Sequence, residues 1–337
     1  MKFLECSGSF AGMGEEYGEQ AREEIQHNAG LFNLLMDINN RDAAAAGISR
    51  AVNKYLPDVY AELAGIARGA NVDLKHILLM NHVDTFGSSA ERCTPVILRK
   101  SSDGVIIAKN NDSPPSANIY DFILRKCTPD KGFPYIQLTY AGWLSGLDMM
   151  NAAGLANTHG SVGSVFDKSG DHVDMRLVMY EIMKNYSKVG DVIRQLSNYP
   201  MTGKGFNIAL GDADGETAML DAALPFIALS GRNKNFDYAT NIYTSQGLEH
   251  ADTRGSARRE ICVYRYGYLK WLEQTRMPEN LTDVKLLLSS HEPWAPCRHG
   301  GPHGSKTDWS MINLVKTKKM LVADGAPCEN KYKEYSI

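Results

Sequence analysis

The sequence has no long hydrophobic run, and this absence argues against several classes of protein. No apolar stretch approaches the length needed to cross a bilayer. The opening residues, MKFLECSGSF, lack the apolar core, roughly 7–15 residues long, of a secretory signal. We therefore expect a cytoplasmic protein that is not attached to a membrane.

The sequence also lacks an excess of charge of either sign. Its 36 Lys and Arg residues nearly balance 39 Asp and Glu residues, which gives a formal net charge of −3. No basic run stands out, so we expect no nucleic-acid partner. With 337 residues, 43% of them hydrophobic, the chain can bury a large core in one domain or two. We predict a single domain over residues 1–337.

Cysteine is scarce, and none of it has Cys-x-x-Cys spacing. The six cysteines are Cys6, Cys93, Cys127, Cys262, Cys297 and Cys328. In a cytosolic chain of this size they are expected to be free thiols. Cys297, His299 and His303 lie close together in sequence, but three glycines and a proline interrupt Cys297–Gly304. A helix that presents both imidazoles to a metal is therefore not expected, and we predict neither a metal site nor a cofactor.

The period of the apolar residues changes from helical to strand-like at Cys93. Before it, stripes such as Tyr17, Ala21 and Ile25 follow a helical repeat. After it come short β-rich runs separated by turn signals, and helical periodicity returns at about 174–196, 255–272 and 281–290. The segment WSMINLVKTKKMLVA is predicted to form a hairpin. Helices, then antiparallel strands, then helices favour a layered α+β fold rather than βαβ units.

The stretch ERCTPVILRKSSDGVIIAKNNDSPP, residues 91–115, places a cysteine at the open end of a predicted hairpin. If SSDG forms the whole loop, Cys93 faces Asp112, whereas a turn of Asp103 and Gly104 alone makes it face Pro114. Either register brings the thiol close to Asp112 and predicts a cluster of thiol, carboxamide and carboxylate. The pattern alone is weak, because a cysteine is more often a small buried hydrophobe.

Short motifs in a fixed order along nearly the whole chain add to this pattern. They are GSFAGMGEEYGEQ, LLMNHVDTF, the pair Cys93-Thr94, the element Asn110-Asn111-Asp112, MMNAAGLANT, NIALGDADGETAMLD, ATN at 239–241, SARRE at 256–260 and PWAPCRHGGPHGSK. In this order they resemble the motifs of the acyl-coenzyme A:6-aminopenicillanic acid acyltransferase family, whose members are N-terminal-nucleophile (Ntn) hydrolases. The resemblance implies an αββα sandwich, with two antiparallel sheets between helical layers.

The resemblance also implies a precursor that cleaves itself before its nucleophile. A cut between Arg92 and Cys93 would give a helical segment 1–92 and a nucleophile-bearing segment 93–337. The new α-amine, with a pKa of about 7.7–8.0, would act as general base for its own side chain. The thiol would attack a carbonyl and form a thioester acyl-enzyme. The implied activity is hydrolysis or formation of a linear amide bond in a small amide or acyl-amine substrate.

Further site residues follow from the resemblance, position by position. Asp112 matches a carboxylate that orients the N-terminal group, Asn241 matches a donor to the oxyanion, and Lys306 stands where the family has an arginine near the nucleophile. Four more residues are expected to bind substrate: Thr94, Asn111, Trp143 and Arg298.

Besides a zinc-dependent hydrolase, which is the most remote alternative, two others stay open at this point. One is a coenzyme A-dependent N-acyltransferase, with acyl-coenzyme A as a second substrate. The other is a non-catalytic, unprocessed binding protein on the same fold, because Thr85, Arg92, Ile242 and Lys306 depart from the family pattern.

Overall fold

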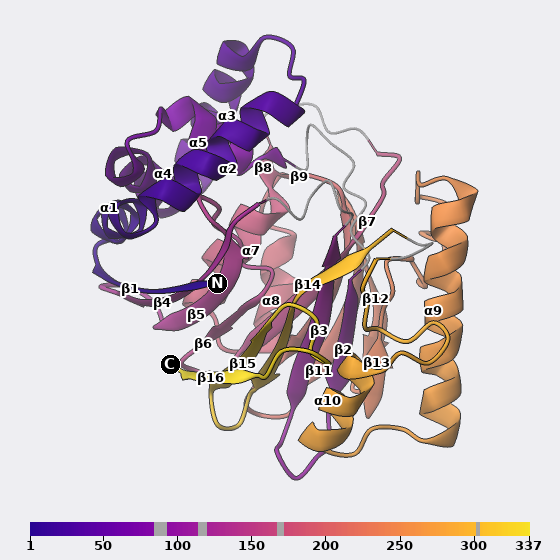
Figure 1. The fold of residues 1–337 in the computed structure, drawn as a ribbon. Coiled ribbons are helices and arrows are strands. Elements are labelled where there is room, and N and C mark those ends of the chain that lie inside the picture. The colour runs from indigo at the N-terminus through magenta and orange to yellow at the C-terminus, as the bar shows by residue number, and fades with distance from the viewer. Residues whose placement is uncertain (84–92, 114–119, 167–171, 301–303) are drawn as a thin grey trace.

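Two β-sheets stacked face to face form the centre of the molecule, and helices cover both outer faces (Figure 1). The computed structural model describes residues 1–83, 93–113, 120–166, 172–300 and 304–337, apart from the side chain of residue 258. One buried core lies between each pair of neighbouring layers. The order helices, sheet, sheet, helices confirms the predicted α+β class and the αββα sandwich.

The larger sheet has eight strands in the order β1-β4-β5-β6-β7-β10-β11-β12. The strands are β1 Lys2–Gly8, β4 Phe122–Pro129, β5 Tyr135–Tyr140, β6 Met149–Asn151, β7 Ala156–Val162, β10 Gly205–Gly211, β11 Thr217–Ala223 and β12 Phe226–Arg232. Only the β1–β4 pair in this sheet is parallel. The chain therefore returns mostly by hairpins, as the closely spaced turn signals predict.

The smaller sheet has six antiparallel strands in the order β13-β2-β3-β14-β15-β16. The strands are β13 Phe236–Tyr238, β2 Thr94–Leu98, β3 Ile106–Ser113, β14 Lys306–Leu314, β15 Lys319–Asp324 and β16 Lys333–Ser336. A separate parallel pair joins β8 Val173–Asp174 to β9 Met201–Thr202. β2 and β3 lie inside the smaller sheet, so both of their edges are paired with neighbouring strands.

The N-terminal helices cover the larger sheet, together with two helices from the middle of the chain (Figure 1). They are α1 Phe10–Gln20, α2 Arg22–Leu35, α3 Arg41–Tyr55, α4 Pro57–Ala70, α5 Leu74–Met80, α7 Met175–Asn185 and α8 Val189–Leu196. α1 and α4 approach closely because glycines face each other. A Cβ on Gly14 would lie 2.1 Å from the Glu62 carbonyl oxygen, and one on Gly65 would lie 2.2 Å from that of Ala11. The glycines of the opening motif thus serve helix packing.

The smaller sheet is covered by α9 Ser256–Thr275 and α10 Leu281–Ser289, drawn in orange in Figure 1. Their apolar side chains pack against Val96, Leu98 and Ile106 from β2 and β3. None of the helices in the described part of the chain combines the length and apolar character needed to span a bilayer.

Most of the predicted elements are present, with shifted ends. The predicted helical region 174–196 is divided into α7 and α8, and the final hairpin is formed by β14 and β15. Asp73 caps α5, where its carboxylate accepts a hydrogen bond from the Lys75 N–H at 2.9 Å.

Candidate active site

The β2–β3 hairpin has a different register from either one predicted. Thr94 pairs with Asn110 and Leu98 pairs with Ile106, so the connection spans residues 99–105 and is longer than a tight turn. Continuing the pairing by one residue places Cys93 opposite Asn111, not Asp112 or Pro114. Both predicted registers were wrong. The Gly104 N–H donates to the Ser101 carbonyl at 3.1 Å, so the tight turn spans 101–104 inside a longer connection, and the Arg99 N–H pairs on the other side of β2, with the Asn235 carbonyl at 2.8 Å.

This register sorts the polar residues of β3 between two faces, because successive side chains of a strand point to opposite sides. The face toward the larger sheet, called the inner face below, carries Lys109 and Asn111. The face toward α9 and α10, called the outer face, carries Asn110, whose amide reaches the Leu288 carbonyl at 2.8 Å. By the same alternation Asp112 belongs to the outer face.

Cys93 is completely buried at the start of β2. Its Sγ lies 3.4 Å from Oδ1 of Asn111, which is the position of a thiol donating to a carboxamide. The Asn111 amide nitrogen in turn lies 3.5 Å from a carboxylate oxygen of Asp308. The hydroxyl of Ser113 also donates to Asp308. A chain of polar groups thus runs from the thiol along the inner face.

Asp308 owes its position to an irregularity in β14. Thr307 pairs with Asp112 and Trp309 with Asn111, so Asp308 is an extra residue in the strand. An extra residue of this kind forms a β-bulge, which redirects side chains locally. The bulge lets the Asp308 carboxylate reach Asn111 and Ser113 while Trp309 packs in the core between the sheets.

Arg265 of α9 binds the backbone and side chains around Cys93. One terminal nitrogen donates to the Cys93 carbonyl at 3.0 Å and to the Thr94 hydroxyl at 2.9 Å. The other donates to the Thr240 carbonyl at 3.1 Å and to Oδ1 of Asn241 at 2.7 Å. The side chain is buried, so these bonds form out of contact with bulk water. The planar fork of the guanidinium suits such a multiple contact.

Asn241 is fixed in orientation by groups on three sides. Its backbone has a φ of +64°, in the left-handed region that asparagine tolerates better than most residues. Its amide nitrogen donates to the Ser161 carbonyl at 2.8 Å, and Arg254 donates to its backbone carbonyl. A carboxamide nitrogen carries two N–H donors, so the second remains for another acceptor.

A small cavity between the sheets borders Asn111 and is lined by aromatic and charged residues. Its lining includes Tyr140, Trp143, His159, Arg176 and Trp309. Trp143 and Asn111 therefore line the same cavity. Among the described contacts, Trp143 forms no hydrogen bond to Cys93 or Asn241.

Charged groups beside this cavity are paired with one another. Nζ of Lys109 lies 2.7 Å from a carboxylate oxygen of Asp148, and both side chains are buried. Burial would raise the pKa of Asp148, but Lys109 and His159 outweigh it and keep that pKa below its usual value. Burial, with Lys109 adding to it, lowers the pKa of His159 to about 4, so His159 is neutral at neutral pH.

Asp112 lies apart from the thiol, on the side of α9. One carboxylate oxygen accepts a hydrogen bond from the Thr307 hydroxyl at 2.7 Å. The other has no hydrogen-bond partner among the described residues. Burial raises the pKa of Asp112 to about 6, against the opposing effects of Arg265, Thr307 and Arg298. Asp112 is connected to Cys93 through the charge of Arg265.

The remaining predicted residues lie near this outer side. Lys306, predicted to be the cation near Cys93, is exposed and pairs with Ser113 across β14 and β3. A buried cation that does contact the Cys93 carbonyl is Arg265. Arg298 is half-buried, and its charge acts on Asp112. Thr94 contacts Arg265. Thr85, Phe86, Arg92 and His303 lie outside the described residues, and with them the bond predicted to be cleaved.

A wider groove lies in the outer helical layer, where α9 meets α10. Its lining includes Tyr268, Arg276, Met277, Leu287 and Glu292. No cysteine belongs to that lining in the described part of the chain, so the groove does not contain the predicted nucleophile.

No protein-family model matches the chain, and no curated protein matches it in sequence. Solved structures similar to it include a mutant of conjugated bile acid hydrolase from Clostridium perfringens, at 12% identity over 73% of this chain and 97% of that chain, with a TM-score of 0.45. Penicillin V acylase from Agrobacterium tumefaciens matches at 14% identity over 69% of this chain and 82% of that chain, with a TM-score of 0.41. A Caenorhabditis elegans N-acylethanolamine-hydrolyzing acid amidase ortholog matches at 12% identity over 66% of this chain and 93% of that chain, with a TM-score of 0.43. Likeness this distant carries no argument about function, which has to come from the site.

Proposed function

We propose that this protein is a cysteine-nucleophile amide hydrolase of the Ntn type. The observation that carries the proposal is the setting of Cys93. It is a buried thiol immediately before an internal strand, with a carboxamide at its sulfur and a guanidinium at its carbonyl. A buried structural cysteine needs neither contact, since it packs as a small hydrophobe.

The proposed reaction begins with cleavage of the peptide bond between Arg92 and Cys93. The freed α-amine then accepts the thiol proton, and the thiolate attacks the substrate carbonyl. The C–N bond of the amide breaks, the amine leaves with a proton, and the acyl group stays on sulfur as a thioester. Water attacks the thioester, releases a carboxylic acid and restores the thiol.

Three residues are proposed to support these steps. Asn111 orients the thiol, and the second N–H of Asn241 donates to the oxyanion of the tetrahedral intermediate. A donor of that kind contributes about 10²–10³ in rate. Arg265 is a positioning residue, because its two nitrogens hold Cys93 and Asn241 in a fixed relation. The resemblance assigns Asp112 an orienting role, which in this geometry would act through Arg265.

The proposed substrate is a small linear amide. The cavity beside Asn111 has a volume of only about 10 Å³, enough for one water, so an acyl part would enter it only after the lining side chains move. The aromatic lining from Tyr140, Trp143 and Trp309 supports an acyl group with an apolar surface. The same thioester can be passed to an amine in place of water, with acyl-coenzyme A as a conceivable donor. Partition of one acyl-enzyme between water and an added amine distinguishes hydrolysis from transfer.

Intact mass under denaturing conditions tests the proposal on three proteins: wild type, Cys93→Ala and the control Cys6→Ala. Cys6 is buried in β1, away from the site. We expect fragments 1–92 and 93–337 from wild type and from the control, and one whole chain from Cys93→Ala. A whole chain in all three proteins, with no selective alkylation of Cys93 by a thiol electrophile, would overturn the proposal in favour of the non-catalytic binding protein.

A further inference from the structure

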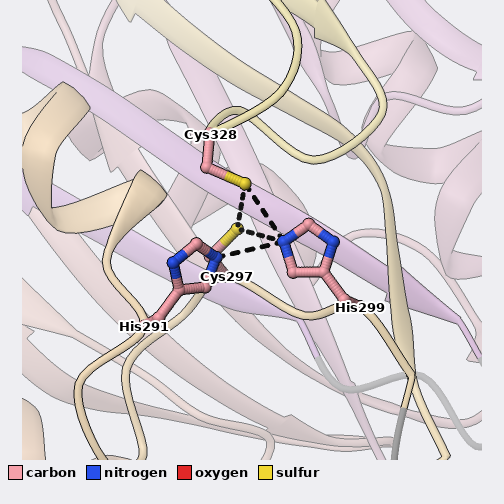
Figure 2. Close-up of side chains that lie close together, drawn as sticks. All are labelled: His291, Cys297, His299 and Cys328. Atoms are coloured by element: carbon pink, nitrogen blue, oxygen red, sulfur yellow. Dashed lines mark hydrogen bonds between the residues drawn. The ribbon is translucent and has the colours of Figure 1, made fainter.

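Four side chains with metal-binding atoms converge at one end of the smaller sheet, beside β14 and β15 (Figure 2). His291 follows α10, Cys297 and His299 lie in the connection from α10 to β14, and Cys328 lies between β15 and β16. Their ligand atoms all fall within 4.8 Å of one another. The side chains point toward a common centre, as Figure 2 shows.

Two of the four distances within this group, 3.5 and 3.6 Å, fall in the range of the edges of a tetrahedral zinc site, and the two of 3.0 Å are slightly shorter. Nε2 of His299 lies 3.0 Å from Nε2 of His291, 3.6 Å from Sγ of Cys297 and 3.0 Å from Sγ of Cys328. The two sulfurs are 3.5 Å apart. Zinc bonds of about 2.3 Å to sulfur and about 2.0–2.1 Å to nitrogen give tetrahedral edges of roughly 3.3–3.8 Å. A disulfide would require sulfurs about 2.05 Å apart.

Contacts around the four ligands hold them in place. Nδ1 of His299, the nitrogen away from the centre, lies 3.4 Å from a carboxylate oxygen of Glu329. A carboxylate on the second imidazole nitrogen fixes the ring and makes it a better ligand. The backbone N–H of Cys297 donates to the Ser290 carbonyl at 3.3 Å, and that of Glu329 donates to the Ala326 carbonyl at 3.1 Å. The two loops therefore present their ligands without rearrangement.

We propose that His291, Cys297, His299 and Cys328 bind one Zn²⁺ as a structural site. Two sulfur and two nitrogen donors in a tetrahedron are typical of zinc. The protein supplies all four ligands, which leaves no open position for a substrate, so the ion would act on the fold. His303, which the sequence pattern placed beside Cys297 and His299, is not needed.

The ion would join two loops that are distant in sequence and would stiffen one end of the active-site region. The loop that carries Cys297 and His299 continues into β14 through Arg298 and Thr307, which exchange hydrogen bonds at 3.0 and 3.1 Å. Thr307 in turn donates to Asp112. Zinc would thereby fix the end of the sheet where Asp112 and Asp308 lie, without taking part in the chemistry.

The metal content of the full chain tests this proposal. We expect one zinc per chain after purification in zinc-containing buffer and dialysis, measured by elemental analysis. Co²⁺ added to the zinc-depleted protein should give the visible d–d bands of a tetrahedral site and a thiolate charge-transfer band. The variants Cys328→Ser and His291→Gln should lose the stoichiometric zinc, whereas His250→Gln and Cys6→Ala, outside the cluster, should keep it. Glu329→Gln should weaken zinc binding about tenfold or more while the stoichiometry at saturation stays one.

Two results would overturn the proposal. One is zinc content that is the same in Cys328→Ser, His291→Gln and wild type, which would place the ion elsewhere. The other is a Cys297–Cys328 disulfide, detected as two fewer free thiols in the denatured wild type and restored by a reductant. If the ligand variants do not fold, the cobalt spectrum and the thiol count of wild type still decide between a metal site, a disulfide and no site.

Discussion

The charged side chains on the two faces of β3 differ in how they are paired, although they are close neighbours in sequence. On the inner face Lys109 is paired with Asp148 in a buried contact, and the pKa of Asp148 is lowered. On the outer face Asp112 has one carboxylate oxygen without a hydrogen-bond partner among the described residues, and its pKa is raised to about 6. The inner face therefore carries a buried ion pair between Lys109 and Asp148, whereas the outer face carries a carboxyl group, Asp112, with a raised pKa.

This difference shows how strand alternation can separate residues that a sequence motif treats as one unit. The element Asn110-Asn111-Asp112 was interpreted as a single cluster beside Cys93. In the structure only Asn111 contacts the thiol, while Asn110 and Asp112 lie toward the helices. We infer that the inner face supplies the chemistry and the outer face supports it, and the following predictions test that division.

The largest effect is expected from Lys109→Met on the inner face. Removal of the cation would leave Asp148 buried without its charge partner, which costs about 3–5 kcal/mol in the free energy of unfolding. Urea denaturation of wild type and variant measures this loss. Lys319→Met, in the exposed pair with Glu334, is the matched control and should cost about 1 kcal/mol or less. An equally small loss for both variants would show that the ion pair of Lys109 and Asp148 contributes no more to stability than an exposed one.

The next effect is a pH dependence on the outer face. The folded pKa of Asp112 is raised to about 6 from an ordinary 3.8, so the folded state binds this proton more tightly than the unfolded state. The resulting stability is present below about pH 4 and is lost as the pH rises through 6, at most about 3 kcal/mol. The positive charges that act on the carboxylate are those of Arg265 on α9 and Arg298, and Lys109 acts on it from the opposite face of β3.

Asp112→Asn should remove this contribution. Between pH 4 and 6 the stability of wild type should fall relative to that of the variant, as measured by urea denaturation at several pH values. Parallel curves for the two proteins would mean that Asp112 is ionised throughout, with partners beyond those described here.

The sequence allowed the layers to be predicted because helical and strand periods alternate in long blocks. The cap of α5 at Asp73, the strands on both sides of Asp103-Gly104 and the final hairpin all follow from local rules. The hairpin register could not be derived, because the turn over 101–104 does not close the ladder directly, and the residues on both sides of it also belong to the connection. An error of one residue was enough to exchange the two faces of β3.

Two site residues escaped prediction for different physical reasons. Arg265 left a signal, since it interrupts the buried stripe of α9 between Cys262 and Leu269, where a charge needs buried partners. Asp308 left none, because a β-bulge determines where its side chain points. The proximity of the four proposed ligands was not predicted, because Cys328 is 31 residues from Cys297. Local spacing cannot reveal such a pair.

The smallest expected effect compares two adjacent asparagines on opposite faces. Asn111→Ala removes the acceptor at the Cys93 thiol and should slow the proposed self-cleavage about 10- to 100-fold, equivalent to about 1.4–2.7 kcal/mol. Asn110→Ala removes a bond to the Leu288 carbonyl and should lower stability by about 1 kcal/mol, with the cleavage rate of the folded protein unchanged. Time courses of intact mass give both rates. If both variants slow cleavage equally, the inner face of β3 has no special part in the chemistry. If Asn110→Ala slows cleavage and Asn111→Ala does not, the outer face supplies the chemistry instead.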